Sequence, residues 1–101
     1  MATITKTMAR GAATTNTGTT LYTVPASTTA VVTNIIVANT AATSATFTLA
    51  LDGVSLFTTV TIAANTTVAI DLKQNLTTTK TITGGASAVT VSFHISGVEI
   101  S

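Results

Sequence analysis

The chain has 101 residues, of which 46% are hydrophobic and only 7% are charged, and its formal net charge is +1. This length allows one domain with a modest core, and the lack of cysteine excludes disulfides, thiolate catalysis and sulfur-ligated metal centres. The few basic residues are scattered, so we expect no nucleic-acid partner. The longest apolar run, Ile35–Ala38, is far shorter than the ~20 residues of a spanning helix, so we expect no membrane partner either.

Threonine accounts for 27 of the 101 residues, and this low-charge composition is unusual for a protein surface. Soluble proteins carry about a quarter charged residues, which keep their surfaces apart. We therefore predict that much of the outer surface lies against copies of the same chain or against a larger assembly.

Apart from Met1, residues 1–18 contain only two large apolar side chains, Ile4 and Met8, together with the cations Lys6 and Arg10. Such a segment buries too little apolar surface to fold by itself, but its alternation suits a strand added to the edge of a neighbour's sheet. The sequence predicts an extended N-terminal arm over residues 1–18, lying outside a domain of residues 19–101. We expect contacts between subunits, made by these four residues, to order the arm.

Threonine, valine and isoleucine recur with period two in the rest of the chain, which indicates an all-β protein. Pro25 ends the first strand in a turn, and the second strand is apolar on both faces, as in the centre of a sheet. The expected strands cover residues 19–24, 29–38, 45–51, 54–62, 66–73, 77–83 and 88–100.

Turn residues separate these strands. Asp52 and Gly53 favour a type I′ hairpin, because both central positions of that turn need positive φ. Residues 77–83 are polar and are expected at a sheet edge, followed by a turn at Gly84 and Gly85. Apolar residues in the last strand change parity at Ser96 and Gly97, which predicts a β-bulge with positive φ at Gly97.

Seven or eight short strands at this spacing predict a single antiparallel β-sandwich or jelly roll.

The chain offers one combination that resembles a hydrolytic triad: Ser92, His94 and Asp71. Neither a nucleophile elbow nor a glycine-rich oxyanion loop accompanies these residues, so we interpret them as a polar stripe. One histidine and three carboxylates show no metal-ligand spacing. We expect no catalytic residues, no metal and no cofactor, and thus no enzyme. Rows of threonine suit ice-binding surfaces as well, but here their spacing is irregular.

Four segments carry a family resemblance: LYTVPAS at Leu21–Ser27, TTAVVTNIIVANT at Thr28–Thr40, LDG at Leu51–Gly53 and ISGVEI at Ile95–Ile100. With these segments the chain resembles the small β-sandwich virion structural proteins of tailed bacteriophages. That group includes head decoration, or cement, proteins, which are commonly trimers at threefold positions of the capsid, and related tail or fibre components. Members of the group often have glycine where this chain has Ser27.

The resemblance implies a non-enzymatic capsid decoration protein on the virion surface, acting as a homotrimer that binds between subunits of the major capsid protein. The alternative is a receptor- or glycan-binding module of a tail or fibre. Sugar sites usually contain an exposed aromatic ring, and the candidates for that role are Tyr22 and Phe57.

Overall fold

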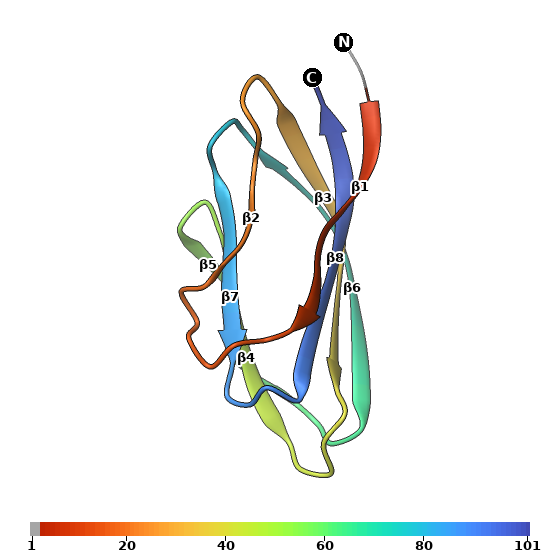
Figure 1. Ribbon diagram of the computed structural model, residues 1–101. Helices are drawn as coiled ribbons and strands as arrows, with labels where there is room; N and C mark the ends of the chain where they lie inside the picture. The colour runs from red at the N-terminus through yellow and green to blue at the C-terminus, as the bar shows by residue number, and fades with distance from the viewer. Residues whose placement is uncertain (1–2) are drawn as a thin grey trace.

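The computed structural model describes residues 3–101, which form two packed four-stranded antiparallel sheets (Figure 1). Sheet A has the strand order β1-β8-β3-β6, and sheet B has the order β2-β7-β4-β5. Successive strands alternate between the sheets except at the β4–β5 hairpin, so the predicted all-β sandwich is confirmed as a two-sheet jelly roll. None of the described residues forms a helix that could cross a membrane. The strand bounds are β1 Thr3–Ala12, β2 Thr20–Thr23, β3 Thr29–Asn39, β4 Ala45–Leu51, β5 Val54–Ile62, β6 Thr66–Leu76, β7 Thr81–Ala86 and β8 Val91–Ile100.

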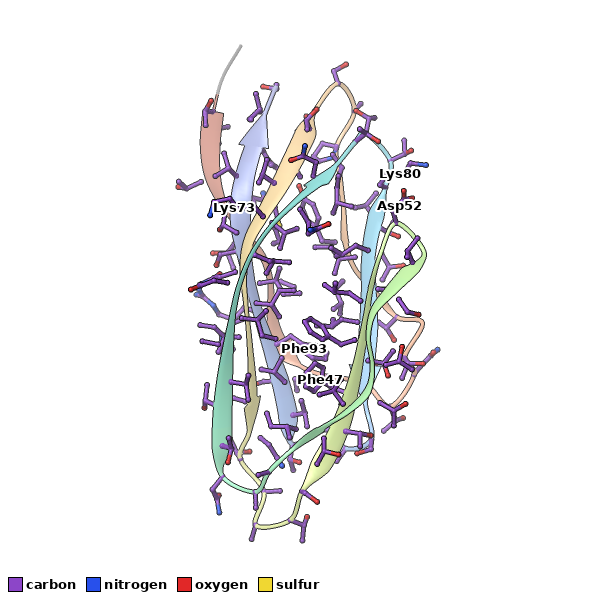
Figure 2. The ribbon with its side chains drawn as sticks, turned by 180° about the vertical axis from the view of Figure 1, so that it is seen from behind. Phe47, Asp52, Lys73, Lys80 and Phe93 are labelled. Carbon is purple, nitrogen blue, oxygen red and sulfur yellow. The ribbon has the colours of Figure 1, made fainter. Side chains whose placement is uncertain are left out.

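The core lies between the two sheets, because β3, β4 and β8 each bury alternate side chains on their inner face. Phe47 of β4 and Phe93 of β8 meet there edge to face, with 6.3 Å between ring centroids (Figure 2). Ile35 of β3 and Leu49 of β4 are fully buried beside them. The apolar residues that recur with period two in the sequence thus form the contact between the two sheets.

The N-terminal segment belongs to sheet A, which corrects the expectation of an arm outside the core. Residues Thr3–Ala12 are extended, as predicted, but they pair along their length with β8 of the same chain. Met8 is only 6% exposed and Ala13 is also buried, both within the core cluster. Pairing with β8, at the other end of the same chain, therefore orders this strand. The domain boundary between residues 18 and 19 stays a prediction.

Gly84 and Gly85 lie inside β7 rather than in a turn, and β7 is a central strand of sheet B rather than an edge. A Cβ on Gly84 would come within 2.6 Å of the Thr48 carbonyl oxygen, and one on Gly85 would come within 2.8 Å of the Thr14 carbonyl oxygen. These glycines therefore allow close approach of neighbouring backbone. The turn before β8 falls instead at residues 87–90.

The bulge predicted in β8 is found instead in the neighbouring strands β1 and β3. β8 keeps its alternation through Gly97, whose φ is not positive, while extra residues are inserted at Met8 of β1 and Thr33 of β3. A Cβ on Gly97 would overlap the Val31 carbonyl oxygen and the Met8 side chain. Gly97 is therefore buried in the core, and Val98 and Ile100 lie on the outer face of sheet A.

Two turns set the ends of the sandwich. Asp52 and Gly53 have φ of 54° and 72°, the positive values that a type I′ hairpin needs. Pro25 follows β2, and the turn after it places Ser27 at φ 56°, a position that suits glycine. Thr28 then exchanges two hydrogen bonds with the Thr78 hydroxyl, which ties this turn to the β6–β7 connection.

Candidate assembly surfaces

The seven charged residues gather at sheet edges and ends. Asp52 and Lys80 form an ion pair of 3.5 Å beside the β4–β5 hairpin. The two edge strands of sheet A carry different charges: β1 has only the cations Lys6 and Arg10, whereas β6 has one acid and one base, Asp71 and Lys73. The seventh is Glu99 of β8.

The outer face of sheet A is mostly uncharged across β8 and β3. Residues that lie opposite one another share a face, and the register gives rows such as Thr5–Val98–Val31 and Ser96–Asn34–Asp71. A shallow cavity of about 310 Å³ opens over β1, β8 and β3, beside the inserted Thr33. The Asn34 side-chain oxygen is buried on this face and has no hydrogen-bond partner among the described residues.

The candidate triad is not assembled. Ser92 and His94 lie on the outer face of β8, and Asp71 lies on β6, with β3 between the two strands. Two strand spacings amount to about 10 Å, which is beyond hydrogen-bond reach. No hydrogen bond joins these three residues within 3–101, and no group of three metal-ligating side chains occurs there. The arrangement supports the interpretation of a polar stripe.

Edge strands β5 and β6 border one side of the sandwich, and this side is apolar. Aliphatic side chains of both strands are exposed along it: Val54 by 69%, Leu56 by 39%, and Val60 and Val68 by 37% each. We call these four residues the lateral seam. Two register irregularities interrupt β5 opposite β4, and Thr59 adopts a φ of 49° at one of them.

Sequence reasoning missed the lateral seam, although a signal was present. The segment Gly53–Ile70 contains no acidic or basic residue, and it forms β5 and the first half of β6. Alternation predicts the face on which a side chain lies but not whether its strand is at an edge, and an edge strand leaves inward side chains partly open to solvent.

Tyr22 and Glu99 connect the two sheets near the chain ends. The Tyr22 hydroxyl donates a hydrogen bond to the Glu99 carboxylate, and the Tyr22 side chain is only 8% exposed. Burial, then the hydrogen bond to Glu99 and its negative charge, raise the pKa of Tyr22 far above its usual range. Tyr22 is thus unavailable for stacking on a sugar. Phe57 is half-buried and packs against Phe47, with 5.7 Å between the ring centroids. Neither aromatic candidate is therefore a fully exposed ring.

The four expected contact residues of the N-terminal strand divide into two groups. Ile4 is 53% exposed, and Lys6 and Arg10 are exposed as well, so these three remain candidates for intersubunit contact. Met8 is buried against Gly97 and belongs to the chain's own core.

Comparisons with solved structures show where else this fold occurs. A chain of the T13 IBDV viral particle, an icosahedral virus, aligns with a TM-score of 0.57 at 12% identity, covering 97% of this chain and 30% of that one. A pentameric capsid protein from metagenomic phage sequences aligns with a TM-score of 0.39 at 18% identity, covering 96% and 59%. The sugar-binding C-terminal domain of EclA aligns with a TM-score of 0.43 at 15% identity, covering 96% and 75%.

At 12% identity the likeness to the IBDV chain is one of fold, and this chain spans less than a third of the length of that chain. No family model matches the sequence, and no curated protein matches it.

Proposed function

We propose that this chain is a non-enzymatic structural protein of a virus particle, acting as a decoration protein on the capsid surface. The observation that carries the proposal is a jelly roll with a mostly uncharged outer sheet and exposed aliphatic residues at its edges. Such a surface is suited to lateral contacts with other protein, because little charge has to be desolvated. The fold shared with a chain of an icosahedral particle supports the same conclusion.

The proposed mechanism is adhesion. The outer face of sheet A and the exposed residues of β1, namely Ile4, Lys6 and Arg10, bind across adjacent subunits of the major capsid protein and hold the lattice together. The homotrimer implied by the family resemblance stays part of this proposal, since trimers suit threefold positions of a capsid.

The decisive experiment is to count copies of the chain in purified particles by quantitative mass spectrometry against the major capsid protein. A decoration protein is expected in a fixed ratio to capsid subunits, with hundreds of copies per particle. A handful of copies would place the chain in a tail or fibre, and absence from particles would overturn the proposal.

A binding assay tests the adhesive surface. Capsids lacking the chain are incubated with purified protein and pelleted, and Arg10→Ala is expected to reduce the bound fraction. Lys80→Ala removes the same charge near the hairpin end of sheet B and serves as the matched control. Equal binding of both variants would show that β1 does not contact the capsid.

A further inference from the structure

One edge of β6 is free of a neighbouring strand among the described residues. β6 is an edge strand of sheet A with eleven residues, Thr66–Leu76, and its outward backbone groups have no neighbouring strand among the described residues. An exposed edge of this length is a template for pairing with another strand, and proteins usually block it with charges or bulges. Here the edge carries one acid and one base, and the pairing of β6 with β3 shifts register between Gln74 and Asp71.

Asp71 and Lys73 lie on one face of β6. Ile70 and Leu72 pack against the core, so the alternation places Asp71 and Lys73 on the outer face of sheet A, where both are exposed (Figure 2). They are the only charged residues of this strand. Because they are two positions apart, an antiparallel copy of the same strand can set each opposite the other.

We propose that two copies of this chain pair through their β6 strands, antiparallel and centred on Leu72. In this register Asp71 of each copy lies opposite Lys73 of the other, which forms two opposite-charge pairs across the twofold axis. Leu72 meets Leu72 of the second copy, and Val68 meets Leu76, on the inner face. The result is one continuous eight-stranded sheet A.

The lateral seam adds exposed apolar surface beside the β6 edge. Its residues belong to β5 and β6, the edge strands that border the same side of the sandwich. When two sheets A join at β6, the β5 strands of the two copies approach each other below the joined sheet, and the exposed Val54, Leu56 and Val60 of one seam face those of the other. Antiparallel pairing therefore covers apolar surface in addition to satisfying the edge. The seam contains no charge that self-association would have to bury.

The charges distinguish a second copy from other occupants. A strand without charge, or one with a single sign, would leave Asp71 or Lys73 unmatched at the edge. Self-pairing about Leu72 neutralises both residues at once. This inference rests on the geometry of β6 and does not depend on the proposed role in a virus particle.

The first test measures mass in solution by sedimentation velocity on the full chain. The wild type is expected to have twice the mass of Asp71→Lys and of Lys73→Asp, because each single reversal sets like charges opposite one another. Each is expected to raise the dissociation constant about tenfold or more. The double exchange of Asp71→Lys with Lys73→Asp restores opposite pairs and should restore the mass. Lys6→Asp, on the far edge of sheet A, is the control and should not change it.

An equal mass for the wild type and both single variants, or failure of the double exchange to restore association, would overturn the proposal. The virion experiments above are read on particles, so a monomer in solution would refute this contact and the proposed homotrimer without touching the proposed location on the capsid.

The second test reads the register. The chain contains no cysteine, so Leu72→Cys introduces one thiol that lies opposite its counterpart across the axis. Mild oxidation is expected to convert Leu72→Cys into a disulfide-linked dimer. Ala69→Cys, on the same strand but opposite Asn75 of the second copy, should stay unlinked. Equal cross-linking of the two variants, or none in either, would refute the register.

Discussion

At the scale of single residues, several polar and charged side chains of this chain have a specific partner. Glu99 accepts a hydrogen bond from Tyr22, Asp52 pairs with Lys80, and the Asn39 amide donates to the Thr43 carbonyl at 2.9 Å. Asn39 is 2% exposed, and such a buried amide is tolerated because its hydrogen bonds are made. The interior can therefore hold polar groups without a network of charges.

The raised pKa of Tyr22 predicts a loss of stability at high pH. The unfolded chain releases the tyrosine proton near pH ~10, whereas the folded chain retains it, so the free energy of unfolding falls as the pH rises above that value. The slope from this group is at most about 1.4 kcal/mol per pH unit. Tyr22→Phe is expected to remove this part of the dependence, measured by urea denaturation across the alkaline range.

The two proteins differ only at residue 22, so the difference in stability between wild type and Tyr22→Phe isolates the tyrosine. Tyr22 is the one tyrosine of a chain without tryptophan, which lets ultraviolet absorbance report its ionisation directly. A stability difference that does not change with pH would contradict the assignment.

Gly85 predicts a second effect at this scale. A Cβ there would come within 2.5 Å of the Asn16 carbonyl oxygen, so Gly85→Ala should force the backbone of residues 14–16 away from β7 and cost roughly 1–3 kcal/mol of stability. Gly11→Ala is the matched control, since a Cβ on Gly11 meets nothing within 4 Å. Chemical denaturation of both variants provides the comparison, and equal stabilities would contradict the close packing.

At the scale of elements, β1 is an edge strand whose one buried large side chain fixes it to the core. Met8 is inserted in a bulge opposite β8 and fills the space above Gly97. Its flexible thioether suits such an irregular gap. The strand thus contributes to the fold and still exposes Ile4, Lys6 and Arg10 for contacts.

Met8→Ala is expected to lower the free energy of unfolding by about 2–3 kcal/mol, because it leaves a cavity between β1 and Gly97. Ile4→Ala removes a comparable side chain that is 53% exposed and should cost well below half as much. Thermal and urea denaturation measure both. If the two variants lose the same stability, β1 is not anchored through Met8.

Most strands could be predicted from alternation, because the period-two pattern of β3, β4 and β8 is also the burial pattern. The errors came from residues whose role is set by distant neighbours. Gly84 and Gly85 read as a turn, but contacts from β4 and residues 14–16 require them inside a strand. Met8 alone gave no sign of a paired strand, because its bulge depends on Gly97. The lateral seam depends on which strands lie at sheet edges, and that order is set by long-range pairing.

At the scale of the whole molecule, the sandwich measures 46 Å along its longest axis, and Thr3 at the start of β1 lies opposite Ile100 at the end of β8 (Figure 1). The two sides of the sandwich differ in chemistry. One side holds β1 and β2, with Lys6, Arg10 and Tyr22. The other side holds β5 and β6, with the lateral seam. This asymmetry gives the proposed capsid contact and the proposed contact between copies separate surfaces, so one chain can make both at once.

The cations of β1 bear on how far such a sheet can grow. After two copies join at β6, both ends of the extended sheet are β1 strands, and each carries Lys6 and Arg10 with no acid to oppose them. Another β1 edge arriving there meets like charge, which disfavours pairing. Growth of sheet A into a fibre, a hazard of open sheet edges, is then disfavoured once two copies have joined.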